Sequence, residues 1–133
     1  MTIFTRIING EIPCYKVAEN EHFFAFLDIA PMTKGHTLVI PKFEAGNEGD
    51  YIFDMDDEMY AGLMMFAKQV AKAIEAAVPC KRVGVAVMGM EVPHVHVHLI
   101  PMNSEKDMVI SNPKLKLEAS EMAEIAANIA AKL

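Results

Sequence analysis

Residues 94–101, with the sequence His-Val-His-Val-His-Leu-Ile-Pro, carry the strongest structural signal in the chain. Histidine and an aliphatic residue alternate three times, and alternation with a period of two residues predicts a β-strand. Because successive side chains of a strand point to opposite faces, the three histidines are expected to form a row on one face. The valines and the leucine would lie on the other face and join a hydrophobic core.

The row of three histidines predicts a ligand-binding site. A lone histidine on a strand is more often a hydrogen-bonded structural residue, but three together are a poor filler for a core, since both nitrogens of each buried ring need partners. One interpretation is a metal site, because His-x-His chelates zinc or copper, although no Asp, Glu or Cys lies inside the run. The other is a phosphate-handling site, because imidazoles donate to phosphate oxygens and one ring can act as a nucleophile.

Length and composition indicate a single domain over residues 1–133. Of the 133 residues 53% are hydrophobic and 23% are charged, which is ordinary for a globular domain. The formal net charge of −6, without a cluster of Lys and Arg interleaved with aromatic residues, argues against nucleic-acid and membrane partners. No apolar run approaches the roughly 20 residues that cross a bilayer, and no signal sequence is apparent, so a cytoplasmic protein is expected. Cys14 and Cys80 form no Cys-x-x-Cys pair and are expected to be packing residues.

The rest of the chain predicts helices beside an antiparallel sheet. Helical spacing predicts a short helix over 3–8, a long helix that begins in the acidic cluster at 54–58 and ends before Pro79, and a C-terminal helix capped by Ser120. Extended patterns predict further strands over 15–17, 22–28, 37–40 and 82–88. Residues 42–51 and 103–116 are predicted to be irregular. This order predicts an α+β domain with an antiparallel sheet of about five strands, one long central helix and a C-terminal helix.

Asp28 falls at the end of the predicted strand over 22–28. A carboxylate at such a position can cap a turn. It can equally accept hydrogen bonds from the two hydroxyl groups of a ribose, because an ionised carboxylate offers two oxygens to a diol. The position alone leaves both roles open.

The three histidines with hydrophobic spacers match the motif of the histidine triad (HIT) family, and the resemblance covers most of the chain from Thr2 to Pro101. Residues 2–8 (TIFTRII) and 10–13 (GEIP) resemble the opening of the Hint-like branch of this family. Residues 25–31 (AFLDIAP) and 35–42 (GHTLVIPK) resemble two further segments, in the same order and spacing. The resemblance implies a HIT-like fold, a homodimer in which two sheets are joined, and no cofactor.

The resemblance also implies a site for a purine nucleotide. It assigns the ribose to Asp28, and it places Glu91 in the turn that touches the phosphate or the leaving group. It assigns the walls of the base pocket to apolar residues that composition alone would place in the core: Ile3, Phe4, Ile7, Ile12, Phe26, Leu27 and Ile29.

The mechanism that the resemblance implies is a double displacement at the α-phosphate. His96 would attack the phosphorus through Nε2 and displace an amine, a phosphate or another leaving group, and water would then hydrolyse the nucleotidyl-histidine. The backbone carbonyl of His94 would accept the Nδ1 proton of His96. His98 and His36 would donate to the nonbridging phosphate oxygens.

Two departures from the family pattern bear on these expectations. Some relatives hold a structural zinc at positions that correspond here to Thr2, Thr5, Glu44 and His94. Only the last is a ligand of the expected type, and a structural zinc needs about four, so no metal is expected.

The second departure lies in the turn before the histidines, where Met90 stands at the position of a common Gln and Glu91 follows. A methionine cannot donate to a phosphate oxygen, and a carboxylate repels one. The expected function is hydrolysis of a nucleoside phosphoramidate or a related nucleotidyl substrate. The alternatives are a nucleotide-binding or protein-interaction module with little turnover, and a dinucleoside polyphosphate hydrolase.

Overall fold

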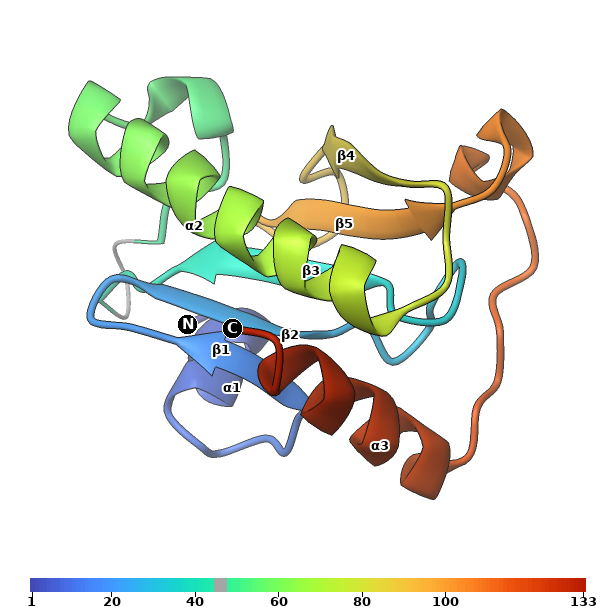
Figure 1. The fold of residues 1–133 in the computed structure, drawn as a ribbon. Coiled ribbons are helices and arrows are strands. Elements are labelled where there is room, and N and C mark those ends of the chain that lie inside the picture. The colour runs from blue at the N-terminus through green and yellow to red at the C-terminus, as the bar shows by residue number, and fades with distance from the viewer. Residues whose placement is uncertain (45–47) are drawn as a thin grey trace.

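The structure, a computed structural model, describes residues 1–44 and 48–133, which form a five-stranded antiparallel sheet with helices on both faces (Figure 1). The strand order is β1-β2-β3-β5-β4. The α+β class predicted from the sequence is confirmed. In chain order the elements are α1 (Ile3–Ile8), β1 (Lys16–Glu19), β2 (Phe23–Leu27), β3 (Thr37–Pro41), the 3-10 helix η1 (Ile52–Asp54), α2 (Asp57–Ala77), β4 (Arg82–Val87), β5 (Val97–Met102), the 3-10 helix η2 (Glu105–Met108) and α3 (Ala119–Ala130).

Strand β2 shows how the two faces of the sheet are used. Phe23 and Leu27 point to the face covered by α2 and α3 and belong to the larger core cluster. Phe24 and Phe26 point to the opposite face and pack with Phe4 of α1. The histidines share the α1 face, because His98 is paired in register with Leu38, a residue of the same small cluster.

The long helix begins and ends where the sequence predicts. Asp56 is the N-cap of α2, and its side chain accepts a hydrogen bond from the Met59 amide at 2.8 Å. Asp57 and Glu58 occupy the first turn, where acidic side chains oppose the helix dipole. The helix ends at Ala77, two residues before Pro79. It buries an apolar stripe against the sheet: Leu63, Phe66, Ala67, Val70, Ala73 and Ile74.

The predicted cap of the C-terminal helix is wrong by two residues. Helix α3 begins at Ala119, and Ser120 lies in its first turn. Glu118 is the N-cap residue, because its backbone is extended while its carbonyl accepts the first helical hydrogen bond, from the Met122 amide at 3.0 Å. Met122, Ala126 and Ile129 of this helix are buried.

Strand β5 begins at Val97, so the prediction of a strand over residues 94–101 is wrong for its first three residues. The reason is that neither neighbouring strand pairs with the residues before it, since Val97 is the first residue of β5 paired with β3 and also the first paired with β4. The alternation of faces nevertheless continues upstream. Val95 is buried in the α2-side core, whereas His94 and His96 contact the ring of Phe4.

The two segments predicted to be irregular contain almost no regular secondary structure among their described residues. Residues 42–44 and 48–51 contain neither helix nor strand, and residues 45–47 lie outside the described residues. The segment 103–116 contains only the short helix η2. Among the described residues, none of the helices combines the length and the apolar character needed to cross a membrane.

Candidate active site

A cavity of about 390 Å³ lies at the end of the histidine row. Four segments that are distant in the sequence form its walls: the turn after β2, the β3 and β5 region with its histidines, the β4–β5 connection, and the coil before α3. Among the residues that line it are Asp28, His36, Glu91, His96, His98 and Lys114. Five residues that the sequence predicts for the site therefore line the same cavity: Asp28, His36, Glu91, His96 and His98.

Asp28 follows β2 directly and is anchored at the cavity wall. Its backbone amide donates to the His36 carbonyl at 3.0 Å, and its Oδ1 accepts from the Ala30 amide at 2.9 Å. Burial raises the pKa of the Asp28 carboxyl, and the Ala30 hydrogen bond opposes this. The turn cap predicted as one role is thus present, but it uses Oδ1, whereas Oδ2 faces the histidines.

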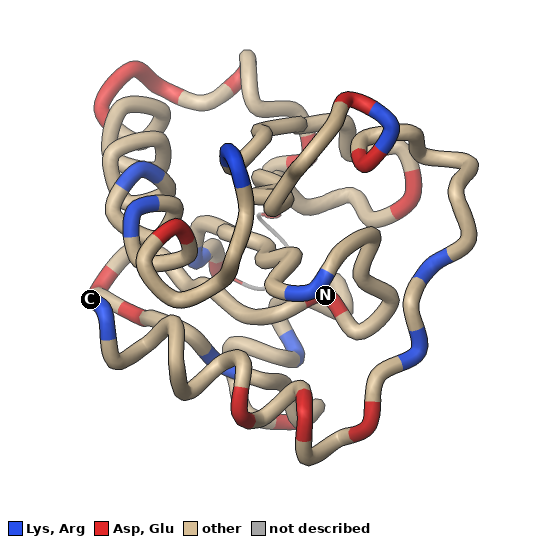
Figure 2. The backbone as a smooth tube through the Cα atoms, turned by 45° about the vertical axis from the view of Figure 1, so that its right-hand side comes forward, with Lys and Arg blue, Asp and Glu red and all other residues tan. Residues whose placement is uncertain are grey.

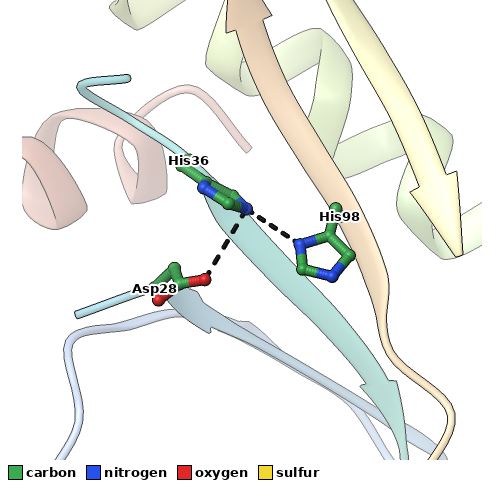
Figure 3. A group of neighbouring side chains, drawn as sticks. All are labelled: Asp28, His36 and His98. Atoms are coloured by element: carbon green, nitrogen blue, oxygen red, sulfur yellow. Dashed lines mark hydrogen bonds and ion pairs between the residues drawn. The ribbon is translucent and has the colours of Figure 1, made fainter. Parts of the chain in front are cut away.

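Hydrogen bonds fix which nitrogen of His36 carries the proton. The Met32 amide can only donate, and it lies 3.0 Å from Nδ1 of His36, so Nδ1 is the acceptor. The proton of the neutral ring therefore sits on Nε2, which donates to Nδ1 of His98 at 3.0 Å. His98 must in turn carry its own proton on Nε2. Figure 3 shows His36 and His98 with Asp28 around this contact.

Both histidines of this pair are neutral at pH 7. Burial lowers the pKa of His36 to about 4, with a smaller contribution from the charge of Lys114. Burial also lowers the pKa of His98 to about 4, with smaller contributions from His36 and His96. The 3.7 Å contact between Nε2 of His36 and Oδ2 of Asp28 is therefore no ion pair at neutral pH. What the pair presents to a ligand is a hydrogen-bond donor on His98.

Asp28, His36 and His98 also bring potential metal-ligand atoms within 4.8 Å of one another. A metal bound at Nε2 of His36 would require the proton to move to Nδ1. That proton would face the Met32 amide, which already donates to Nδ1 at 3.0 Å. The backbone around His36 thus fits a hydrogen-bonded histidine pair better than a metal ligand.

His96 carries the bare nitrogen of the site. Its Nδ1 lies 2.7 Å from the backbone carbonyl of His94, which can only accept, so Nδ1 carries a proton, and in the neutral ring Nε2 has the lone pair. The ring is buried and held between the rings of Phe4 and His98, each with a centroid separation of 5.0 Å. A fixed imidazole with an unprotonated Nε2 beside a cavity is the arrangement that nucleophilic catalysis requires.

His94 does not line the cavity. It is completely buried, and both of its ring nitrogens have protein partners, the Pro41 carbonyl and the Thr2 hydroxyl, each at 2.8 Å. Thr2 and Thr5, which the resemblance places at zinc positions of some relatives, are joined by the hydrogen bond from the Thr5 amide to the Thr2 hydroxyl oxygen, and Glu44 is exposed. Through its backbone carbonyl, His94 still contacts the ring of His96, which does line the cavity.

The residues predicted to wall a base pocket are divided by the structure. Phe4 and Phe26 are buried against each other, with ring centroids 5.7 Å apart, and Leu27 points into the α2-side core. The side chain of Leu27 is therefore on the wrong face for the predicted role, because successive residues of β2 alternate. Ile3 and Ile29 are exposed, Ile29 to 77%. The two remaining members of the set are half-buried: Ile7 and Ile12.

Sequence reasoning missed the part of the cavity wall that comes from the coil before α3. Ile110 and Lys114 line the cavity, and the Leu115 amide ties this segment to the Pro31 carbonyl at 2.8 Å. The ammonium group of Lys114 donates to the carbonyls of Ile110 and Asn112 at 2.6 and 2.8 Å. In Figure 2 this segment runs along the edge of the molecule and carries Lys positions. A polar stretch without periodicity gave no signal for such a contact.

Comparison with known proteins identifies the family. The HIT domain profile matches residues 9–105. An adenosine 5'-monophosphoramidase of Saccharomyces cerevisiae is 35% identical over 98% of this chain and 82% of its own, and one of Schizosaccharomyces pombe is 37% identical over 98% and 97%. A HIT-like protein of Bartonella henselae superposes with a TM-score of 0.85 at 30% identity, covering 99% of this chain and 96% of its own. A zinc-bound histidine triad protein of Mycobacterium smegmatis gives 0.78 at 25%, with coverages of 98% and 91%. This chain belongs to the HIT family.

Proposed function

We propose that this protein hydrolyses nucleoside 5′-phosphoramidates, or related nucleotidyl substrates, at the α-phosphate through a covalent intermediate on His96. The observation that carries the proposal is the hydrogen bond from Nδ1 of His96 to the carbonyl of His94, which leaves Nε2 bare beside the cavity. The two fungal relatives named adenosine 5'-monophosphoramidases support this class of substrate.

The charges and hydrogen bonds of the cavity suggest how a nucleotide would lie. The α-phosphate would sit over His96, with the proton on Nε2 of His98 donated to a nonbridging oxygen. The ribose hydroxyls would donate to Oδ2 of Asp28, the oxygen that the turn leaves available. The base would pack on the exposed side chains of Ile3 and Ile29.

The proposed reaction has two steps that conserve charge and protons. First, Nε2 of His96 forms a bond to phosphorus, the P–N bond to the amine breaks, and the leaving amine takes up one proton. Second, water attacks phosphorus, the bond to His96 breaks, and the water releases one proton. Each cycle returns His96 to its starting state, and one difficult displacement is divided into two easier ones.

A substrate panel with a matched pair of variants tests this proposal. We expect the protein to hydrolyse adenosine 5′-phosphoramidate, and we expect His96→Ala to lose at least about 1,000-fold in kcat because it removes the nucleophile. AMP affinity, measured by titration calorimetry, should change little. His22→Ala, which removes an exposed histidine outside the cavity, should behave as wild type. Retained turnover in His96→Ala would remove His96 from the nucleophile role.

A second candidate function, nucleotide binding with little turnover, is favoured by the β4–β5 connection. Glu91 lines the cavity, and Met90 beside it is 90% exposed. A carboxylate close to the leaving group repels phosphate, and the methionine supplies no donor. Binding of AMP without turnover of phosphoramidate, diadenosine polyphosphate or nucleotide sugar would favour this function, and preferred cleavage of the polyphosphate would favour a dinucleoside polyphosphate hydrolase.

The homodimer implied by the family resemblance is also part of the proposal. Strand β4 is an edge strand of the sheet, and it exposes Val85 to 52%. Pairing of two β4 edges would join the sheets of two copies and cover this apolar side chain. The cytoplasmic location and the preference for a purine base stay predictions from the sequence.

A further inference from the structure

The carbonyl that orients the proposed nucleophile lies outside the sheet. Strand β5 begins at Val97, so the His94 carbonyl, which accepts the Nδ1 proton of His96 at 2.7 Å, belongs to no strand ladder. On this segment the His94 amide donates to the nearby Val92 carbonyl at 2.8 Å. The Val95 amide bonds the carbonyl of Gly49, in a loop, at 2.8 Å. The His94 carbonyl shares its peptide plane with the Val95 amide, so the bond to Gly49 holds one edge of that plane. The anchored side chain of His94 holds the Cα atom at the other end of the plane.

The His94 side chain is held at both nitrogens in one defined tautomer. The Pro41 carbonyl can only accept, so Nε2 of His94 carries the proton and donates to it at 2.8 Å. Nδ1 is then an acceptor, and the Thr2 hydroxyl donates to it at 2.8 Å. Burial lowers the pKa of His94, which keeps the ring neutral and preserves this pattern.

The hydroxyl of Thr2 is itself oriented by neighbours on α1 and in the loop before η1. Since its only proton goes to His94, its oxygen is free to accept, and it accepts from the Thr5 amide at 3.1 Å as the N-cap of α1. The Thr5 hydroxyl is buried and donates to Oε1 of Glu48 at 3.1 Å. The same carboxylate oxygen accepts from the Thr2 amide at 3.0 Å. Hydrogen bonds thus connect Glu48 through Thr5 and Thr2 to the ring of His94, whose backbone carbonyl in turn bonds His96.

We propose that Thr2, Thr5 and Glu48 are positioning residues for catalysis, which hold His94 so that its carbonyl fixes the tautomer and ring angle of His96. The inference rests on the proposed role of His96 as nucleophile. Thr2 is the critical member, because a hydroxyl can accept from the start of α1 and donate to His94 at once, and an aliphatic side chain of the same shape can do neither. Without that donor, the buried Nδ1 of His94 loses its partner, and the ring is held by the Nε2 bond to Pro41 and by packing against Phe4 and Phe43.

The test compares Thr2→Val with Thr2→Ser and with Thr33→Val. The serine variant keeps the hydroxyl, so it should rescue activity. The Thr33 hydroxyl donates to the Pro101 carbonyl at 2.8 Å, so Thr33→Val removes a hydrogen bond of equal length that does not touch His94. We expect Thr2→Val to lower kcat for adenosine 5′-phosphoramidate by about 10- to 100-fold, with KM within about twofold, because ground-state binding is untouched. Thr2→Ser and Thr33→Val should stay near wild type.

A second readout does not depend on turnover. In nitrogen-15 spectra of histidine-labelled protein, His96 of the wild type should show one tautomer with the proton on Nδ1, and Thr2→Val should show a mixture of both. Equal kcat in Thr2→Val and Thr33→Val would overturn the inference, and so would an unchanged single tautomer of His96 in Thr2→Val. If the wild-type protein hydrolyses no nucleotide, the proposed function is refuted. The spectra would still show whether Thr2 fixes the tautomer of His96, which is the claim made here.

Discussion

Four histidines of this site perform different tasks because their partners differ. A neutral imidazole has one donor and one acceptor nitrogen, so each fixed partner determines what the other nitrogen can do. The Met32 amide makes His36 a donor toward His98. The carbonyl of His94 holds the proton of the neutral His96 ring on Nδ1, which leaves Nε2 as the acceptor that the proposed mechanism uses as the nucleophile. Backbone groups therefore determine which nitrogen of His36 and of His96 carries the proton.

Asp28→Ala tests whether the carboxylate binds a ribose. We expect AMP affinity to fall by about 1–2 kcal/mol, because two hydroxyl groups lose their acceptor, while affinity for the 2′,3′-dideoxy analogue changes little. Titration calorimetry with both nucleotides measures the difference. Asp28→Asn is the matched control for the turn, since an amide oxygen can still accept from Ala30. Equal weakening of both nucleotides would mean that Asp28 acts only as a turn cap.

At the scale of single residues the sequence predicted those members of the site that carry a pattern. The spacing of the histidine triad predicted His96 and His98, and the two family-like segments predicted Asp28 and His36. These four residues line one cavity in the structure. Lys114 could not be predicted, because its place at the cavity follows from the path of a coil that crosses the molecule. Leu27 was assigned to the wrong side, because the family pattern did not specify which face of β2 carries it.

At the scale of elements, sequence periodicity predicted which face of a strand is buried better than it predicted where a strand or helix begins. The alternation around His96 separated the residues of the core from the histidines of the opposite face correctly, although the paired part of the strand begins only at Val97. An element ends where its hydrogen-bond partners end, and those partners are residues on other strands. The cap of α3 shows the same limit, since Ser120 is a good cap residue in a helix that begins earlier.

The edge strand β4 carries the prediction for assembly. Val85→Glu should convert a dimer into a monomer, because it would place two carboxylates close together where two β4 edges pair. Light scattering after size-exclusion chromatography at micromolar concentration measures the mass. Val109→Glu is the matched control, because Val109 is exposed to 44% but does not lie on β4. A monomeric wild type, or a Val85→Glu variant that remains dimeric, would contradict the proposed pairing.

At the scale of the whole molecule, the neutral histidine pair makes stability depend on pH. His36 and His98 have a pKa of about 4 in the folded protein, below the value of about 6.5 expected for the unfolded chain. Between these values the unfolded state binds more protons, so their contribution is fully present above pH 6.5 and is lost as the pH falls toward 4. Asp28 opposes this trend, because its pKa is raised by burial.

Urea unfolding at pH 7, 6, 5 and 4 measures this dependence. We expect the free energy of unfolding to fall over that range by on the order of 1–3 kcal/mol for each of the two histidines, from the size of the pKa shift. In His98→Gln the loss should be smaller, whereas in His22→Gln, which changes an exposed histidine, it should equal that of the wild type. A wild type equally stable at pH 7 and pH 4 would contradict the assignment of a buried neutral pair.

The site as a whole is assembled from segments that meet only in the folded chain. The β2 turn supplies Asp28, the sheet supplies the histidines, and the coil before α3 closes one side with Lys114. This assembly puts His96 at the cavity wall, and the proposed chemistry depends on Nε2 of that ring reaching the phosphorus atom of a bound nucleotide.

Mass spectrometry of the nucleotidyl adduct tests this placement most directly. The protein is mixed with a slowly hydrolysed adenylyl substrate and quenched at alkaline pH, since a phosphorus–histidine bond is labile to acid, and the digested peptides are fragmented. An added adenylyl mass on His96, absent from His96→Ala, is the predicted result. An adduct on another residue, or full turnover with no adduct on His96, would contradict the mechanism.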